Sequence, residues 1–315
     1  MPNTMNNDSK TQADTLSSDT PVVSIILPTY NRAKYLAAAI HSVLAQKVSF
    51  PIEIIVVDDN STDNTTQVVS DIGDARVKYI PLKERHGGGG ARNKGIEYST
   101  GKYIGFIDSD VTWLPLKLEK QIAELESNPK YACTYSTFYK ISSSGEKVVQ
   151  PKNTYSGWVN EKLLLSNFID MPTVIIRRDA IDKVGGFDEK LPRFQDWELF
   201  LRVSKEYQIH CFEEPTIESL DLPDSISRND LARDEALKHI YEKHGAEFKK
   251  DAVLHKQILL KLANANFILG KKQAGVAYLR QAKDMLTPLE LISYSIFSQL
   301  PKKIIIKINK LKKKV

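Results

Sequence analysis

The sequence predicts an α/β fold in which a mostly parallel sheet is flanked by helices and followed by an α-helical C-terminal extension. Short apolar runs alternate with amphipathic segments over residues 21–228, which is the pattern of βαβ units. From residue 229 the strand pattern stops, and helical periodicity continues to residue 315. Residues 1–20 are rich in Asn, Asp, Ser and Thr, so we expect a disordered N-terminal tail there.

Composition limits the class of protein. The chain has 315 residues, of which 42% are apolar, enough for one large domain and an appendage. Its net charge is +5, but residues 302–314 hold seven lysines and no acid, so the remainder is slightly acidic. We therefore expect no nucleic-acid partner, because the basic character is confined to one end of the chain.

The sequence shows neither the apolar core of a signal peptide nor a run of about 18 apolar residues. This pattern is expected of a cytoplasmic protein that is soluble or bound to a membrane surface. Cys133 and Cys211 have no spacing typical of a disulfide framework or a metal site.

The first predicted strand is the apolar run 22–27, which closes at Thr29. Asn31 is a suitable cap for an amphipathic helix over 32–46, in which apolar residues recur at helical spacing.

A second buried strand, 52–57, ends in the adjacent acids Asp58 and Asp59. A helix through Val68 follows, and a short strand is expected at 77–80. The candidate caps of that helix are Ser61, Thr62 and Asp63.

The glycine-rich stretch from His86 to Gly90 predicts a flexible loop that enters a helix over 91–99. The next strand is a run of aromatic and β-branched residues from Tyr103, and it ends in Asp108 and Asp110.

The second half of the domain alternates less regularly. Its predicted elements are helices over 115–127, 158–168, 178–184 and 197–206, strands over 131–141, 172–176 and 207–212, a loop over 142–156 and a hinge over 221–227.

Polar or acidic residues follow three predicted strands, at Thr29, at Asp58-Asp59, and at Asp108 and Asp110. The C-terminal ends of parallel strands meet at one edge of a sheet, where ligands bind. Paired carboxylates after a buried strand cost desolvation free energy unless a cation balances them. A divalent cation that carries a phosphate ester is one explanation, and a capped turn is the other.

Five motifs in this order resemble the inverting family 2 glycosyltransferases of the GT-A fold. The motifs are Pro28-Thr-Tyr-Asn31, Val57-Asp-Asp-Asn-Ser-Thr-Asp63, Gly90-Ala-Arg-Asn-Lys-Gly95, Asp108-Ser-Asp110 and Gln195-Asp196. The resemblance covers about residues 21–228. It implies a nucleotide-binding half, 21–110, an acceptor half, 111–228, and transfer of a sugar from a nucleoside diphosphate to a hydroxyl group.

For the nucleotide, the resemblance implies that Asp59 accepts the imide N–H of uracil, which cytosine lacks. Thymine offers the same group, so both UDP and dTDP remain open. Asp58 is either a second nucleotide contact or a cap of the next helix. Thr29 is expected near the base through its backbone, or as a simple turn residue.

For the diphosphate, the resemblance implies that Arg92 makes a charge-assisted contact and that Asp110 coordinates Mg²⁺ or Mn²⁺. Asp108 is expected to reach the ribose or the metal. The chain has His86 to Gly90 where the family usually has Asn-x-Gly before the Ala-Arg-Asn triplet.

For catalysis, the resemblance implies that Asp196 is the base that takes the proton of the acceptor hydroxyl. The alternative is that Asp196 only caps the helix 197–206. The family commonly has Glu-Asp at this motif, and this chain has Gln195-Asp196.

In the C-terminal tail, Leu300, Ile304, Ile308 and Leu311 share one helical face, and Lys303, Lys307, Lys310 and Lys314 share another. This segregation favours an interfacial helix on an anionic membrane, at the inner face of the cell membrane, over a solvated lysine run. The stretch 262–282 resembles one tetratricopeptide-like helix pair.

Together these features predict a non-processive, inverting, metal-dependent hexosyl- or N-acetylhexosaminyltransferase. It would move a sugar, from UDP-sugar in the first instance, to a glycan or lipid-linked glycan in surface polysaccharide biosynthesis. The processive members carry Gln-x-x-Arg-Trp and spanning helices, and the sequence shows neither. The alternatives are a nucleotidyltransferase, or a membrane-associated scaffold with a non-catalytic domain of this type. A dehydrogenase would need Gly-x-Gly-x-x-Gly after the first strand, and the sequence lacks this motif there.

Overall fold

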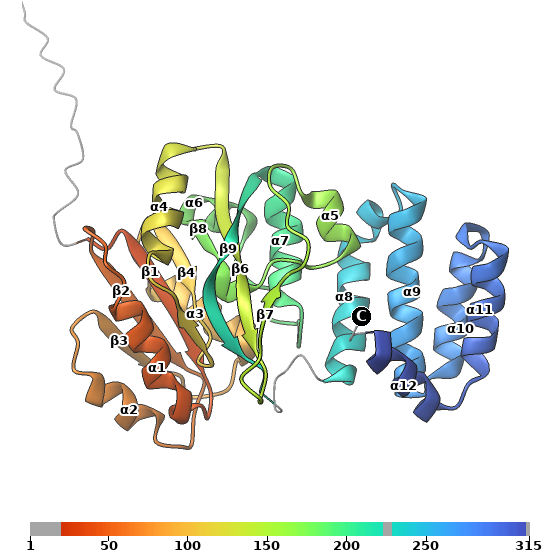
Figure 1. Cartoon of the computed structure of the whole chain (residues 1–315), viewed down its shortest axis with the longest axis horizontal. Coiled ribbons are helices and arrows are strands. Elements are labelled where there is room, and N and C mark those ends of the chain that lie inside the picture. The colour runs from red at the N-terminus through yellow and green to blue at the C-terminus, as the bar shows by residue number, and fades with distance from the viewer. Residues whose placement is uncertain (1–19, 223–228, 313–315) are drawn as a thin grey trace, which may run out of the picture.

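The computed structural model describes residues 20–222 and 229–312 (Figure 1). The expected tail of residues 1–20 lies outside the described residues except for Thr20, as do most of the predicted hinge and residues 313–315. The strands are β1 Val23–Thr29, β2 Ile52–Asp58, β3 Val77–Pro81, β4 Tyr103–Phe106, β5 Val111–Trp113, β6 Tyr131–Ile141, β7 Lys147–Gln150, β8 Ile175–Arg177 and β9 Gln208–Leu220.

The helices of the α/β body are α1 Ala33–Leu44, α2 Thr65–Ile72, α3 Gly87–Tyr98, α4 Lys117–Ser127, α5 Asn160–Leu165, α6 Arg178–Val184 and α7 Gln195–Glu206, with a short 3₁₀ turn at Met171–Thr173. The C-terminal helices are α8 Asp230–Phe248, α9 Ala252–Leu269, α10 Lys272–Ala282, α11 Pro288–Gln299 and α12 Lys302–Lys312.

One mixed sheet organises the described body, in the order β3-β2-β1-β4-β8-β6-β9-β5, and β7 pairs with the C-terminal part of β6. The nucleotide half, β3-β2-β1-β4, is entirely parallel. The acceptor half pairs β8 antiparallel to β4 and β6, and β5 antiparallel to β9, while β6 and β9 are parallel. The α/β fold is confirmed, but the sheet as a whole is mixed, because the acceptor half lacks repeated βαβ crossovers.

Alternate residues of the central strands face opposite layers of helices, as the two-residue period of a strand requires. Ile25 and Leu27 pack with α1, α2 and α4 on one face. Ile26 and Phe106 pack with α5, α6 and α7 on the other, and Ile55 meets Ala91 of α3 there. Both faces are covered, so the strands read as continuous apolar runs.

Several boundaries differ from the predictions. The polar stretch expected as a loop contains β7, which pairs with β6 as a hairpin, and the three residues of β5 follow Asp110 directly. The strand predicted at 172–176 is a 3₁₀ turn followed by the shorter β8. The last strand, β9, runs to Leu220 because its edge pairs with both β6 and β5.

Helix capping also differs. Asn31 has a left-handed backbone, with φ 51°, and its side chain accepts from Thr62 instead of capping α1. The first amide of α1, that of Ala33, donates to Asp63 at 3.1 Å. Asp63 also accepts from Thr65 at the start of α2, so one carboxylate serves two helix N-termini.

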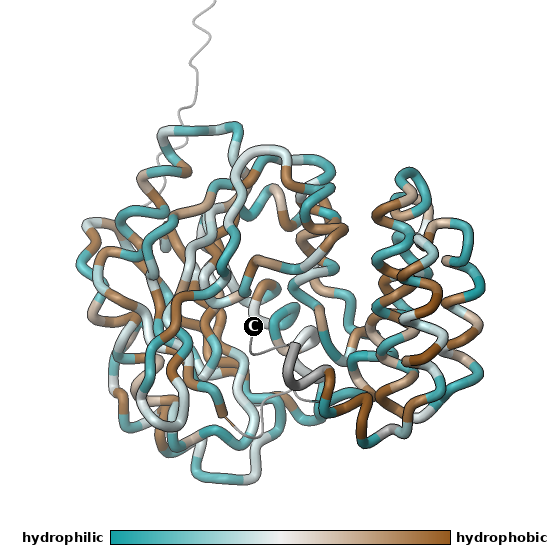
Figure 2. The backbone as a smooth tube through the Cα atoms, turned by 45° about the vertical axis from the view of Figure 1, so that its right-hand side comes forward, coloured by the Kyte–Doolittle hydropathy of each residue, from teal (hydrophilic) through white to brown (hydrophobic). Residues whose placement is uncertain are grey.

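The C-terminal helices α9, α10 and α11 stand in a row beside the α/β body (Figures 1 and 2). The α9–α10 pair turns at Gly270 and packs closely, because a Cβ on Gly275 would lie 2.5 Å from the Phe267 ring. The largest hydrophobic cluster runs from the sheet through α7 into α8 and α9, where Ile240 and Ile258 belong to it.

The last helix, α12, packs against α9. Ile305 of α12 is buried and packs with Phe267 and Ile268 of α9. Ile304, on the predicted apolar face, is 44% exposed. No helix in the described ranges is long and apolar enough to cross a membrane.

Candidate active site

The ends of β1, β2 and β4 bring the predicted nucleotide residues to one edge of the sheet. Thr29 and Asp58 are partners in the parallel register, and the Asp59 amide donates to the Thr29 carbonyl at 2.9 Å. The β1–β4 ladder continues to Ile107, whose amide donates to Ile26, and Asp108 follows directly. The sequence-predicted convergence of these strand ends is therefore present.

Asp59 is buried and holds the start of α3. Its carboxylate accepts from the amides of His86, at 2.6 Å, and Gly87, at 3.0 Å. Gly87 has φ 72°, a conformation that favours glycine, so this contact depends on its lack of a side chain. Arg85 lies 3.7 Å from Asp59 and stacks on the Tyr30 ring at 3.6 Å. Tyr30, Arg85 and Asp59 therefore place an aromatic ring, a cation and a carboxylate close together, a combination that suits a planar nucleotide base.

Asp58 has a different environment. Its two oxygens accept from the Ser61 amide at 2.9 Å and from the Tyr79 hydroxyl at 2.6 Å. Both contacts lie within the protein, so Asp58 orders the turn that carries Asp59. The buried hydroxyl of Thr29 has no hydrogen-bond partner in the described part of the chain.

The four glycines from Gly87 to Gly90 are the first turn of α3, not a flexible loop as predicted. A Cβ on Gly90 would lie 2.6 Å from the His86 Cβ, and one on Gly88 would crowd Arg92 and Gln195. The glycines thus let the N-terminus of α3 approach Gln195, which begins α7 and precedes the predicted base.

Arg92 connects the two halves of the site. Its Nη2 donates to Asp108 at 2.6 Å, and its Nη1 donates to Gln195 at 3.4 Å. The guanidinium is mostly buried and lies 5.7 Å from the Phe187 ring. Next to it, Asn93 exchanges hydrogen bonds with the Phe187 backbone, at 2.7 and 2.9 Å, and so fixes the loop after α6.

Asp196 lies inside the first turn of α7, which begins two residues earlier than predicted. Its Oδ1 accepts from the Trp197 amide and its Oδ2 from the Asn167 side chain, both at 2.8 Å. Burial raises the pKa of Asp196, and these two hydrogen bonds oppose the shift. Phe194, just before the helix, has the unfavourable φ of 62° and packs edge-on against Trp197.

Asp170 is an acid of the site that sequence reasoning missed. Burial raises its pKa to about 7, and the neighbouring carboxylates of Asp196, Asp108 and Asp110 add to the shift, while Arg92 opposes it. These four carboxylates therefore lie in one region. Arg92 is the single cation among the charged groups that shift the pKa of Asp170. The signal in the sequence was a lone acid in the apolar stretch 168–176.

This cluster fits a divalent cation. Asp108 and Asp110 offer hard oxygen ligands at the end of a strand, and the surplus of negative charge calls for a positive partner. Across residues 20–222 and 229–312, no group of three or more His, Cys, Asp or Glu side chains forms a complete metal site. Asp110 and Asp108 are the residues that would hold such a cation.

A second network docks the C-terminal helices behind this site. Glu198 of α7 is fully buried and is contacted by Arg202 at 2.8 Å, Lys243 at 2.9 Å and His244 at 3.1 Å. Burial alone would raise the pKa of Glu198, but these contacts outweigh it and hold the pKa well below its usual range. Glu198 therefore joins α7, which carries Asp196, to α8.

Comparison with protein families decides the identity. The profile described as glycosyl transferase family 2 matches residues 24–185, about half of the chain. The chain belongs to glycosyltransferase family 2. Its match covers β1 through α6, including every predicted nucleotide residue, while Asp196 lies beyond the matched range.

Relatives of this family 2 glycosyltransferase include named enzymes. It is 34% identical over 194 residues to the UDP-Glc:alpha-D-GlcNAc-diphosphoundecaprenol beta-1,3-glucosyltransferase WfgD of Escherichia coli, covering 61% of this chain and 73% of WfgD. It is 38% identical over 202 residues to an uncharacterized glycosyltransferase of Rickettsia prowazekii, covering 60% of this chain and 62% of that protein. It is 33% identical over 167 residues to the putative teichuronic acid biosynthesis glycosyltransferase TuaG of Bacillus subtilis, covering 52% of this chain and 65% of TuaG.

Among solved structures, residues 1–349 of S. aureus TarS in complex with UDP-GlcNAc match with a TM-score of 0.59 and 22% identity, covering 78% of this chain and 72% of TarS 1–349. This likeness shows the shared fold. The family and fold expected from the five motifs are thus confirmed, and the roles of single residues rest on the geometry above.

Proposed function

We propose that this family 2 glycosyltransferase is a non-processive inverting enzyme. It moves a hexose or N-acetylhexosamine from a UDP-sugar to a hydroxyl of a glycan or lipid-linked glycan in cell-surface polysaccharide biosynthesis. The observation that carries this proposal is the position of Asp196. Its carboxylate is held by Asn167 and electrostatically coupled to Asp108, which ends β4 on the nucleotide side.

The donor side is argued from Asp59, Arg85 and Tyr30. A uracil base stacked near Tyr30 would offer its imide N–H to the remaining lone pairs of Asp59, which already accepts two backbone amides. Arg92 would contact the diphosphate with a charge-assisted hydrogen bond. Bound Mg²⁺ or Mn²⁺ on Asp110 would neutralise the negative charge that grows on the departing nucleotide.

On the acceptor side, Asp196 takes the proton of the attacking hydroxyl as the new glycosidic bond forms. A hydroxyl that attacks from the face opposite the departing nucleotide would invert the configuration at the anomeric carbon. A raised pKa suits this role, because a stronger base accepts the proton more readily. WfgD is named for a lipid-diphosphate acceptor, and this supports an acceptor of the same class here.

A membrane location is supported by α11. Leu289, Ile292 and Ile296 recur at helical spacing on one face and are 80%, 59% and 59% exposed. The exposed Lys303 and Lys307 follow on α12. We propose that this apolar face and these lysines bind the enzyme peripherally to an anionic bilayer at the inner face of the cell membrane, where a lipid-linked acceptor is available.

The two alternatives have less support. A nucleotidyltransferase needs a phosphate-binding loop directly after β1. Here Thr29, at the end of β1, instead accepts a backbone hydrogen bond from the Asp59 amide. Burying Asp170 and Asp196 beside Asp108 is unfavourable for folding, and a non-catalytic scaffold would have no need of these acids.

A screen of UDP-glucose, UDP-GlcNAc and dTDP-glucose with Mn²⁺ tests the proposal, with decyl α-D-GlcNAc and its diphosphate-linked counterpart as acceptors. Transfer is read as nucleoside diphosphate release and glycan mass, and the anomeric configuration of the product by NMR. We expect one UDP-sugar to be used with inversion. Retention of configuration, or nucleotide transfer in place of sugar transfer, would overturn the proposal.

A further inference from the structure

Three cations gather behind the helix that carries Asp196. Arg193 precedes α7, Arg233 lies on α8 and Lys261 lies on α9. Arg193 donates to the Asn229 carbonyl at 3.5 Å, and Lys261 donates to the Leu165 carbonyl.

Lys261 also links this group to the base, because its Nζ lies 5.0 Å from the ring of Trp197, the residue after Asp196. In the ranges that the structure describes, no carboxylate forms an ion pair with any of the three cations.

Arg233 acts electrostatically on each of the other two cations. Burial lowers the pKa of Arg193, and the charge of Arg233 lowers it further. Burial lowers the pKa of Lys261 to about 8, again with a contribution from Arg233. Asp230 acts on both arginines and Asp196 on Arg193, and these acids offset only part of the positive charge. The group therefore favours a bound anion.

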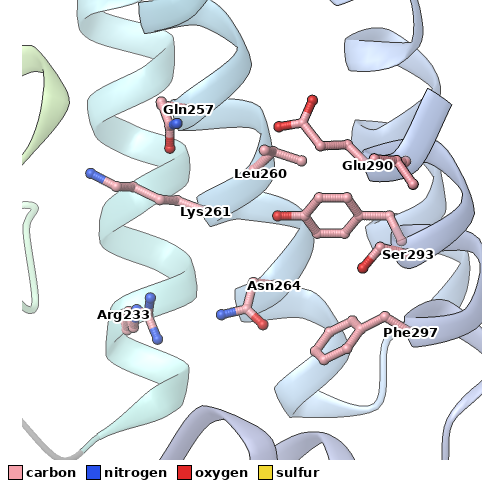
Figure 3. A pocket seen from close by; sticks show the side chains of 10 residues that line it. Arg233, Gln257, Leu260, Lys261, Asn264, Glu290, Ser293 and Phe297 are labelled. Atoms are coloured by element: carbon pink, nitrogen blue, oxygen red, sulfur yellow. The ribbon is translucent and has the colours of Figure 1, made fainter. Parts of the chain in front are cut away.

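A cavity of about 540 Å³ adjoins this group (Figure 3). Arg233 and Lys261 form part of one wall, and Phe297 of α11 lies across from them. Tyr294 of α11 also lines the cavity. Glu290, also on the α11 side, is paired with Lys256 at 3.2 Å, which leaves its charge compensated. The cavity is thus cationic toward the catalytic domain and has two aromatic rings on the side of α11, whose outer face is apolar.

We propose that Arg193, Arg233 and Lys261 bind the diphosphate of a lipid-diphosphate-linked acceptor, with its terminal sugar directed to Asp196 and its lipid chain toward the aromatic side of the cavity. This inference rests on the proposed function and names the subsite for the acceptor. The donor diphosphate has its own partners at the strand ends, Arg92 and Asp110, in the nucleotide half. Two arginines suit a diphosphate because each guanidinium offers a planar pair of donors.

The test compares two acceptors that differ only in the diphosphate. One is α-D-GlcNAc joined through a diphosphate to a decyl chain, and the other is decyl α-D-GlcNAc. Arg193→Gln and Arg233→Gln remove one charge each and keep polar side chains. Arg280→Gln is the matched control, since Arg280 is an exposed cation of α10 outside the cavity.

We expect Arg193→Gln and Arg233→Gln each to raise the KM of the diphosphate acceptor about tenfold to hundredfold, the range for one charge-assisted contact. The KM values of decyl α-D-GlcNAc and of the UDP-sugar should stay within about twofold, and Arg280→Gln should match the wild type. Calorimetric binding of the diphosphate acceptor without donor should fall by the same factor in both variants.

Equal effects on both acceptors, or no effect on either, would overturn the inference. So would loss of binding to phosphatidylglycerol vesicles with an unchanged KM in detergent, because the cations would then serve a phospholipid headgroup. Failure of the wild type to transfer sugar to either acceptor would count against the proposed function instead, and the calorimetric comparison would still decide whether the three cations bind the diphosphate.

Discussion

Arg92 Nη2 lies 2.6 Å from Asp108 Oδ1, and the same guanidinium reaches Gln195, the neighbour of Asp196. One side chain therefore touches the acid that ends β4 and the segment that carries the proposed base. The Gln195 that departs from the usual family residue has a role in this contact, because it accepts from Arg92 without adding another negative charge to the four carboxylates.

We predict that Arg92→Lys weakens UDP binding at least tenfold, although the charge is kept. A lysine ammonium cannot contact Asp108, Gln195 and a phosphate with separate, fixed donors as a guanidinium can. Isothermal titration of UDP with Mn²⁺ measures the effect. Lys94→Arg, at an exposed residue two positions further along α3, is the control and should bind UDP as the wild type does. Wild-type affinity of Arg92→Lys for UDP would show that Arg92 does not contact the diphosphate.

Asp196→Asn should lower kcat about 10²- to 10⁴-fold, the usual contribution of a general base. The amide keeps the size of the side chain and can still accept from the Trp197 amide, although it loses the hydrogen bond that Asp196 accepts from Asn167, and it cannot take a proton. UDP affinity should be unchanged, which separates loss of the base from loss of the fold. Transfer at the wild-type rate would show that another group is the base.

Asp170→Asn should stabilise the protein in metal-free buffer near pH 8, by about 1–2 kcal/mol or a few degrees in Tm. The folded-state pKa of Asp170, about 7, lies above its ordinary value of 3.8. The folded state therefore binds more protons between pH 4 and pH 7, and stability falls as the pH rises through this window. Thermal unfolding at pH 4 and pH 8 checks the sign, since the two proteins should differ little at pH 4. A larger difference at pH 4 than at pH 8 would contradict it.

Glu198→Ala should destabilise the protein by about 3–5 kcal/mol, because it leaves Arg202 and His244 without their buried anion. The pKa of Glu198 is held low, so its contribution is present above the unfolded-state pKa and is lost as the pH falls. Urea unfolding at pH 7 measures the loss. Glu242→Ala, at an exposed acid of α8, should change stability by less than about 0.5 kcal/mol. Equal free energies of unfolding for Glu198→Ala and Glu242→Ala would show that Glu198 does not hold α8 against α7.

Ile292→Ser combined with Ile296→Ser should reduce binding to anionic vesicles at least tenfold, because two exposed apolar side chains no longer enter the bilayer. Val253→Ser is the control, as Val253 is 55% exposed but lies on α9. Cosedimentation with vesicles that contain phosphatidylglycerol measures binding. Unchanged binding of the double variant would exclude α11 as the membrane contact.

The nucleotide half was predictable because its information is local. Continuous apolar runs marked β1, β2 and β4, and an acid or threonine at each end marked the ligand edge. The acceptor half was less predictable, because β7 and the C-terminal part of β9 show little apolar periodicity. These segments become strands through their pairing with β6. The α3 start was misplaced because four glycines resemble a loop in sequence, whereas here they allow close approach of His86 and Gln195.

The candidate site was predictable only where a motif named the residue. Asp59, Asp108 and Asp196 are in motifs, whereas Asn167 and Asp170 become visible only when the loop after α5 folds back beside α7. The C-terminal region shows the same limit. Helical periodicity predicted α12, but which of its residues is buried depends on how α9 lies against it.

The hydrophobic cluster shared by the sheet, α7, α8 and α9 has a consequence for exchanging parts between relatives. A chimera joined near residue 229 would pair a foreign catalytic half with Ile240 and Ile258, whose packing partners lie on α5 and α7. Glu198 would also have to find matching cations on the new helices. An exchange between family members that keeps this packing therefore requires the segment from β6 through α9 to move together.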